Sequence, residues 1–191
     1  MNRLLSEHAE DYVYLSASKA KKRNLEIVAS LVQNGAFTFS CVRNPWDRLI
    51  SAWLNKIKNT RGSERFLKSR LRRCQQLDSS ALVDEIVNGD FAFFVEKLAG
   101  SELFSKDNHF KPQSKILAHH RLDYLARFER YERDMLHILH RLGLPRLELP
   151  HLNSTRGQKR SKAYYSPRTQ DIVRELYARD IEKYKYTFEE I

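Results

Sequence analysis

Residues 37–53 read Phe37-Thr38-Phe39-Ser40-Cys41-Val42-Arg43-Asn44-Pro45-Trp46-Asp47-Arg48-Leu49-Ile50-Ser51-Ala52-Trp53, and their pattern changes abruptly in the middle. Phe37 to Val42 form a short apolar, β-prone run, which predicts a buried strand. Pro45 fixes its own φ and disfavours helical geometry at Asn44. From Trp46 onward apolar residues recur at steps of three and four, which predicts a helix. The stretch therefore predicts a strand, a sharp turn and a helix.

Two side chains at this turn are candidates for binding an anion. Arg43 follows the predicted strand, and Ser51 lies eight positions later, about two turns into the predicted helix. Ligands of open α/β sheets bind beyond the carboxyl ends of the strands. The planar fork of an arginine matches a phosphate, and a helix-borne hydroxyl supplies a further donor. The alternative is that Arg43 pairs with a carboxylate and that Ser51 is a small packing residue.

Residues 43–53, R-N-P-W-D-R-L-I-S-A-W, resemble the motif R-[DEN]-P-x-x-R-[LI]-[VI]-S-A-[YFW] of the Golgi-type carbohydrate sulfotransferases (family 2) and their bacterial relatives. In that family the Arg and the Ser bind the 3′-phosphate of PAPS (3′-phosphoadenosine 5′-phosphosulfate), so the resemblance assigns this role to Arg43 and Ser51. The segment Asp107–Gln113 is similar to the family's H-W-x-P-Q-like segment. Residues 124–134, Y-L-A-R-F-E-R-Y-E-R-D, are similar to a later family segment, with Ala126 in place of the usual Gly.

A fourth segment, Leu149–Gly157, resembles the family's loop that closes over the nucleotide, which assigns Ser154 and Arg156 to nucleotide binding. The resemblance is clearest over residues 36–188. It implies an α/β, P-loop-NTPase-like sulfotransferase fold, with a small parallel sheet flanked by many helices in one domain over residues 1–191. It also implies transfer of a sulfuryl group from PAPS to a hydroxyl of a carbohydrate acceptor. Acidic carbohydrates are among the expected acceptors. PAPS is the co-substrate, and the chemistry requires no metal.

The family's N-terminal strand–loop–helix, P-K-x-[GA]-[CST]-[ST], binds the 5′-phosphosulfate, and no segment of this chain matches it. One alternative is that Ser16-Ala17-Ser18-Lys19 takes this role without the Pro and the Gly. The other is that the chain begins after the lost loop, as a truncated, mis-started or diverged protein. In the latter case we expect a relative that only binds PAPS or 3′,5′-ADP.

The candidate general base is His109, which lies in the polar segment around Phe110. A histidine suits proton abstraction because imidazole titrates near neutral pH. The alternative is that His109 has a structural or acceptor-positioning role. No two histidines share a metal-binding spacing with a third ligand, so the sequence predicts no zinc site.

The chain has 191 residues, which is enough for one domain with a real core. Lys and Arg exceed Asp and Glu by 34 − 24 = 10, which favours anionic partners without choosing among them. A basic nucleic-acid-binding domain is a further alternative, although the sequence has no recognition-helix signature or aromatic platform. The basic segment 61–73 predicts an exposed, partly helical insertion that either holds an acidic acceptor or is a solvated face.

Two cysteines, Cys41 and Cys74, form no disulfide framework and no metal cluster, and we expect Cys41 to be buried in its strand. No apolar run reaches about 18 residues and no signal peptide is evident, so the sequence predicts no transmembrane helix. We therefore expect a cytoplasmic protein if the chain is complete and bacterial. We expect a Golgi lumen or membrane location if it is a fragment of an animal-type enzyme, because animal family members are membrane-anchored.

Overall fold

The computed structural model describes residue 30 and residues 33–58, 61–73, 80–118, 121–146 and 158–191. Contacts divide the chain into two compact units, Met1–Cys41 with Arg121–Ser154 and Val42–His120 with Thr155–Ile191. Each unit has buried hydrophobic residues of its own. Whether the chain forms one domain over residues 1–191 stays a prediction.

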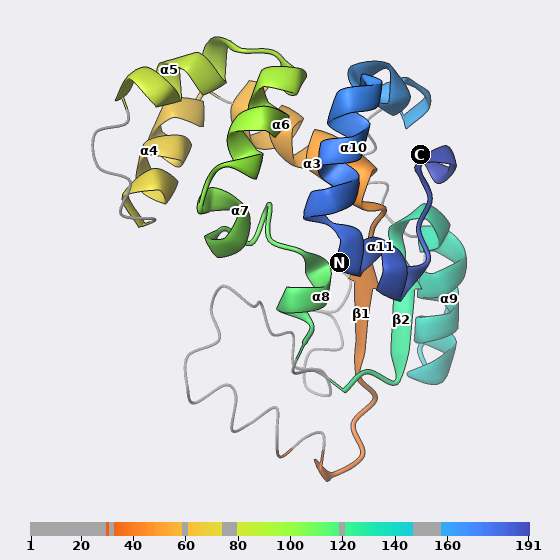
Figure 1. Ribbon diagram of the computed structural model, residues 1–191. Coiled ribbons are helices and arrows are strands. Elements are labelled where there is room, and N and C mark those ends of the chain that lie inside the picture. The colour runs from red at the N-terminus through yellow and green to blue at the C-terminus, as the bar shows by residue number, and fades with distance from the viewer. Residues whose placement is uncertain (1–29, 31–32, 59–60, 74–79, 119–120, 147–157) are drawn as a thin grey trace. The chain divides into compact units, whose positions relative to one another are not determined.

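The first unit contains a small parallel sheet of two strands, β1 (Phe39–Val42) and β2 (Tyr124–Arg127). Asp123 anchors the start of the sheet, because its Oδ2 accepts hydrogen bonds of 2.8 Å from both the backbone N–H and the hydroxyl of Thr38. Figure 1 shows the two strands side by side, with helix α9 (Tyr131–Arg141) along β2. The α/β class and the parallel sheet are therefore confirmed, whereas the P-loop-like fold stays a prediction.

The core of the first unit forms where α9 covers the sheet. Ala126 of β2 and Met135 and Ile138 of α9 are buried together. Asp134, also buried, accepts a hydrogen bond of 2.7 Å from the backbone N–H of Arg127 and so joins the end of β2 to the helix. Gly143 follows α9 with φ +68°, a left-handed conformation that ends the helix at little cost for glycine.

The expectation that Cys41 is buried is wrong, because Cys41 is exposed. Successive side chains of a strand point to opposite faces. Val42, the next residue, takes the buried side and packs against Tyr184 and Tyr186.

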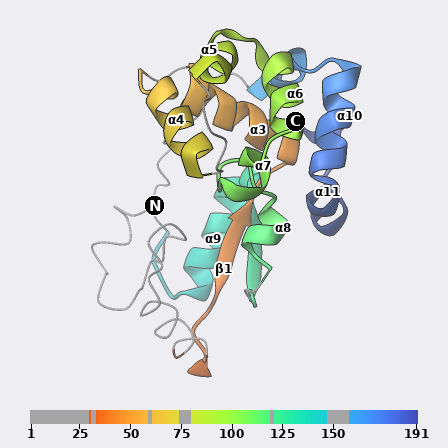
Figure 2. The same ribbon diagram turned by 60° about the vertical axis from the view of Figure 1, so that its left-hand side comes forward.

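The second unit is helical, and α3 (Pro45–Trp53) contributes one side of its length to the core. Trp46, Leu49, Ile50 and Trp53 are buried on one side of this helix, as the spacing predicts. In Figure 1, α3 lies behind α6 and α10, and Figure 2 shows it between α4 and α6. The other helices are η2 (Leu54–Lys58), α4 (Ser63–Arg73), α5 (Ser80–Asn88), α6 (Phe91–Ala99), α7 (Leu103–Lys106), α8 (Gln113–Ile116), η4 (Gln158–Tyr164), α10 (Pro167–Leu176), α11 (Ala178–Tyr184) and η5 (Phe188–Glu190), and the first unit adds η3 (Phe128–Arg130).

Local residues explain where α3 begins. The side chain of Asn44 accepts a hydrogen bond of 3.1 Å from the backbone N–H of Trp46, as an N-cap does. Pro45 occupies the first helical position, where its missing N–H costs nothing. Asn44 is fully buried, and its Nδ2 donates to the backbone carbonyl of Thr187, so the cap also ties the corner to the C-terminal segment.

The basic segment 61–73 is helical, as predicted, but it is not only a solvated insertion. It forms α4, and its Leu67 and Leu71 are completely buried in the core of the second unit. The helix is therefore amphipathic, with Arg65 and Arg72 exposed to solvent.

Two further helices begin after a residue whose side chain caps them. Asp90 precedes α6 and accepts a hydrogen bond of 2.8 Å from the backbone N–H of Phe93. Ser166 precedes α10 in a capping box with Thr169, and Pro167 is the first helical residue. Among the described residues, none of the helices has the length and apolar content that crossing a membrane requires.

Candidate functional site

Arg43 lies directly after β1 and before α3, where the sequence predicts it. Its Nε and Nη2 both lie 2.6 Å from Oδ2 of Asp47. The two side chains are only 16% and 7% exposed, so the pair is well shielded from water. The other oxygen of Asp47 accepts a hydrogen bond of 3.1 Å from the hydroxyl of Ser161 on η4. Arg43 thus pairs with a carboxylate, which was the alternative left open, and this pairing orients the guanidinium.

Ser51 is half-buried on α3, and its hydroxyl lies 3.4 Å from Nδ2 of Asn55. Arg43, Asp47, Ser51 and Asn55 follow one another at steps of four. Residues four apart are neighbours on one side of a helix. Asp47 and Ser51 are therefore neighbours on one side of α3, and Arg43, which precedes the helix, joins them through its ion pair with Asp47.

The backbone of Arg43 is fixed by the side chain of Gln113. Oε1 of Gln113 accepts a hydrogen bond of 2.9 Å from the N–H of Arg43, and its Nε2 donates one of 2.8 Å to the carbonyl of the same residue. The amide thus pairs with the corner as a neighbouring strand would. Asp180 holds Gln113 in turn, because its two carboxylate oxygens accept 2.7 Å hydrogen bonds from the backbone N–H groups of Gln113 and Ser114.

The segment that carries His109 is held by Arg48 of the same motif helix. The Nη1 of Arg48 donates to the carbonyl of Lys111 at 3.0 Å, and its Nη2 donates to that of Asn108 at 2.8 Å. The buried hydroxyl of Tyr177 donates to the carbonyl of Phe110 at 2.6 Å. Burial lowers the pKa of Arg48, but the guanidinium remains charged at neutral pH. Burial raises the pKa of Tyr177, so its phenol remains neutral.

His109 is paired with Asp107. Its Nδ1 and its backbone N–H both lie 2.8 Å from Oδ1 of Asp107. Nε of Arg70 on α4 lies 2.9 Å from Oδ2 of the same carboxylate, as an ion pair without hydrogen-bond alignment. Burial acts to raise the pKa of Asp107, but the hydrogen bonds from His109 and the charge of Arg70 outweigh it and hold the pKa below its ordinary value. The carboxylate is therefore ionised at neutral pH.

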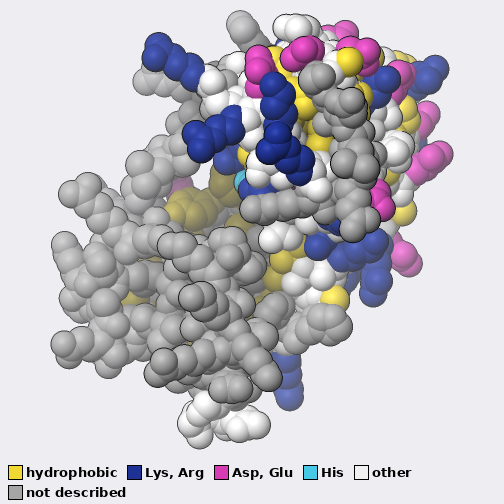
Figure 3. Space-filling view, turned by 90° about the vertical axis from the view of Figure 1, so that its left-hand side faces the viewer, with side chains coloured by type: hydrophobic (Ala, Val, Ile, Leu, Met, Phe, Trp, Pro, Cys, Tyr) yellow, Lys and Arg dark blue, Asp and Glu magenta, His cyan; other side chains and the backbone are white. Residues whose placement is uncertain are grey.

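Helix α4 faces this histidine with an aromatic ring as well. The rings of Phe66 and His109 meet edge to face, with centroids 5.5 Å apart. Arg61, Arg65 and Arg72 are exposed on or beside the same helix. Figure 3 looks onto the side of the molecule where α4 lies, and Lys and Arg side chains stand out on it.

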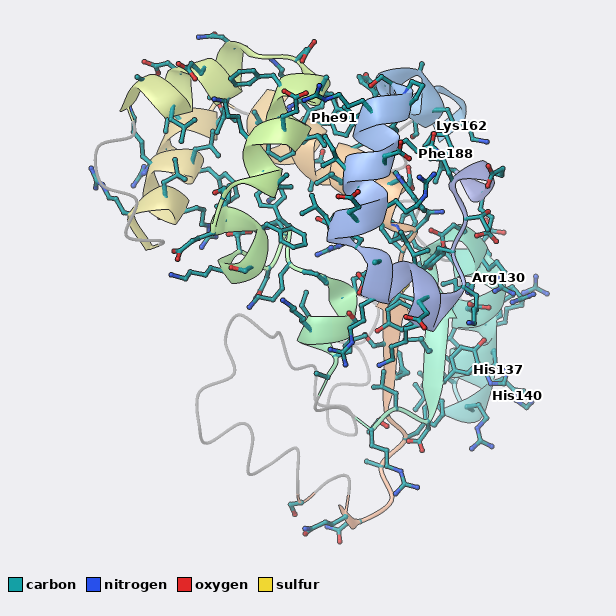
Figure 4. The ribbon with its side chains drawn as sticks, viewed as in Figure 1. Phe91, Arg130, His137, His140, Lys162 and Phe188 are labelled. Carbon is teal, nitrogen blue, oxygen red and sulfur yellow. The ribbon has the colours of Figure 1, made fainter. Side chains whose placement is uncertain are left out.

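Within the second unit, the fold connects Arg43, Ser51 and His109 through α3, because the corner, the serine and Arg48 all belong to that helix or its start. Ser154 and Arg156, assigned to the nucleotide, lie outside the described residues, as does Ser16-Ala17-Ser18-Lys19. His137 and His140 are exposed on α9 (Figure 4). No group of side chains suited to a metal ion occurs in the part of the chain that the structure describes.

Sequence reasoning missed the residues that hold the site together. The pairs Arg43–Asp47 and Asp107–His109 had local signals, a spacing of four at a helix start and the pattern D-x-H. Gln113 and Asp180 had none, since their partners lie about 70 positions away.

Comparison with known proteins gives one positive result. No curated protein and no solved structure matches the chain significantly. A family model described as "Sulfotransferase family" matches residues 5–187, which is nearly the whole chain. The match includes the strand–helix corner, the Asp107–His109 segment and the helices α10 and α11. The chain therefore belongs to the sulfotransferase family.

Proposed function

We propose that this protein transfers a sulfuryl group from PAPS to a hydroxyl of a carbohydrate acceptor. Arg43 and Ser51 bind the 3′-phosphate of the donor, and His109 is the general base. The observation that carries the proposal is that Arg43 lies at the corner that leads into α3, while α3 itself carries Ser51 and holds the segment of the candidate base through Arg48.

The corner suits an anion for two reasons. Arg43 is fixed at its backbone by Gln113 and at its side chain by Asp47, so little conformational entropy is lost when a ligand binds. A guanidinium has five N–H donors in a planar fork, so an ion pair with one carboxylate oxygen is compatible with a phosphate contact. Ser51, on α3, adds a hydroxyl donor.

His109 suits a general base because a buried, ionised carboxylate pairs with its Nδ1. PAPS supplies the sulfuryl group when it is bound. The acceptor oxygen forms a bond to the sulfur, the bond between the sulfur and the bridging oxygen of the 5′-phosphate breaks, and 3′,5′-ADP leaves with the electron pair of the broken bond. The acceptor proton passes to His109, and Asp107 stabilises the imidazolium that forms. Ser154 and Arg156 remain proposed nucleotide ligands.

Calorimetry with 3′,5′-ADP tests the donor site. Charge-assisted hydrogen bonds contribute about 1.5–3 kcal/mol each, so we expect Arg43→Ala to weaken binding at least tenfold and Ser51→Ala to weaken it about threefold to tenfold. The matched control is Arg174→Ala, which removes an arginine from an exposed ion pair with Asp171 on α10. Unchanged affinity in a folded Arg43→Ala protein would overturn the assignment.

Incubation with PAPS and a panel of neutral and acidic oligosaccharides, with release of 3′,5′-ADP as the signal, tests the reaction. We expect turnover with at least one acceptor and its loss in His109→Ala. Tight binding of 3′,5′-ADP without turnover on any acceptor would instead support a relative that only binds the nucleotide.

A further inference from the structure

We infer that Asp107 and Arg70 are positioning residues for His109, which hold its imidazole as the tautomer whose Nε2 accepts a proton. The inference rests on the role proposed for His109. It makes helix α4 a part of the catalytic site, although the sequence predicts a basic insertion there.

The first argument is the geometry of the carboxylate. One oxygen of Asp107 accepts a hydrogen bond of 2.8 Å from the backbone N–H of His109, and the same oxygen lies 2.8 Å from Nδ1 of the ring. A carboxylate that is ionised has no hydrogen to donate, so the hydrogen of this contact belongs to Nδ1. The lone pair of the neutral ring then lies on Nε2, and that nitrogen is the base.

The second argument is that Asp107 is itself held from the opposite side. The carboxyl side chain is 4% exposed, and Arg70 approaches its second oxygen at 2.9 Å. The hydrogen bonds from His109 and, to a smaller extent, the charge of Arg70 favour the ionised carboxylate in a site where water does little to stabilise it. The guanidinium also lies 5.2 Å from the ring centre of Phe66, whose edge-to-face contact with His109 limits rotation of the imidazole.

The third argument is that both supports are rigid. Helix α4 is anchored by Leu67 and Leu71, which are completely buried. On the other side, Arg48 and Tyr177 hold the carbonyls of the residues around His109. The histidine side chain itself is 36% exposed, so the ring is held at one nitrogen and remains accessible to an acceptor.

Nitrogen NMR of the full-length ¹⁵N-labelled protein tests the inference without any need for activity. At a pH where the ring of His109 is neutral, long-range ¹H–¹⁵N correlations show which nitrogen carries the hydrogen, and the His109→Gln protein identifies the signal. We expect the hydrogen on Nδ1. A hydrogen on Nε2 in the wild-type protein would overturn the inference.

Two variants extend the test. In Asp107→Ala we expect both tautomers to be populated and kcat to fall about 100-fold, with the KM for PAPS within about threefold of wild type, because general base catalysis contributes about 10²–10⁴-fold. The control Asp171→Ala removes an exposed paired carboxylate and should change neither readout. Arg70→Met should lower kcat less than Asp107→Ala does, and a kcat within threefold of wild type in Asp107→Ala would refute the positioning role. If no acceptor is turned over, the NMR result still decides the tautomer, while the proposed function fails separately.

Discussion

Replacing Gln113 with glutamate exchanges the side-chain NH2 group for an oxygen, and it tests whether Gln113 supports the backbone of Arg43. The amide of Gln113 accepts from the N–H of Arg43 and donates to its carbonyl at 2.8 Å. A carboxylate of the same shape keeps the first contact but has no donor for the second. The carbonyl of Arg43 then faces a carboxylate oxygen of residue 113, and Gln113 is only 7% exposed in the wild-type protein.

The magnitude follows from these contacts. Replacing this hydrogen bond by a contact between two oxygens costs about 1–3 kcal/mol, and the poorly solvated charge adds to this, so we expect Gln113→Glu to lower the free energy of unfolding by about 2–4 kcal/mol at pH 7. The loss is large against the roughly 5–15 kcal/mol of a typical domain. We also expect weaker binding of 3′,5′-ADP, because Arg43 is displaced.

Urea unfolding measures the free energy, and the dependence on pH gives a sharper signature. Burial raises the pKa of the introduced carboxyl above its value of about 4.3 in the unfolded chain. The penalty is therefore present at neutral pH and shrinks as the pH falls through the raised value, because the protonated acid again donates to the carbonyl. Gln33→Glu makes the same charge change at an exposed position and should stay within about 0.5 kcal/mol of wild type. Equal stability of Gln113→Glu and Gln33→Glu would refute the pairing.

Two further changes test the support of the His109 segment and a helix cap. Tyr177→Phe removes the hydroxyl that donates to the carbonyl of Phe110, and we expect a loss of about 1–2 kcal/mol by urea unfolding at pH 7. Burial raises the pKa of Tyr177 in the folded state, so the contribution of this phenol to stability is complete below about pH 10 and declines as the pH rises further. The free energy of unfolding should therefore fall less steeply above pH 10 in Tyr177→Phe than in wild type. Parallel curves for the two proteins would contradict this. Asp90→Ala removes the cap of α6 and should cost about 1 kcal/mol in thermal unfolding, whereas Asp84→Ala, at an exposed position of α5, should cost little; equal effects would argue against the cap.

For the candidate site, the sequence predicts where Arg43 lies but not all of the side chains that pair with the site residues. The motif predicts Arg43 after a strand, and the structure places it there. The sequence left open whether this arginine pairs with a carboxylate, and the ion pair with Asp47 decides that question. The pattern D-x-H contains the partner of His109 within two residues, so this contact could have been predicted. The contact of Arg70 with the same carboxylate could not, because it depends on how α4 packs.

The sequence alone determined the elements whose signals are local. The strand–turn–helix corner, the cap at Asp90 and the left-handed glycine after α9 depend on residues within a few positions of one another, whose backbone preferences act before any tertiary contact forms.

Only the tertiary structure decided which side chains support the corner and which face of a short strand is covered. Gln113 and Asp180 reach their partners across about 70 positions, and Cys41 is exposed although its strand is apolar. Such contacts depend on the packing of helices against each other, and a burial pattern depends on what covers each face. Neither is encoded in the spacing of neighbouring residues, since many distant partners satisfy the same donor, acceptor or apolar surface equally well.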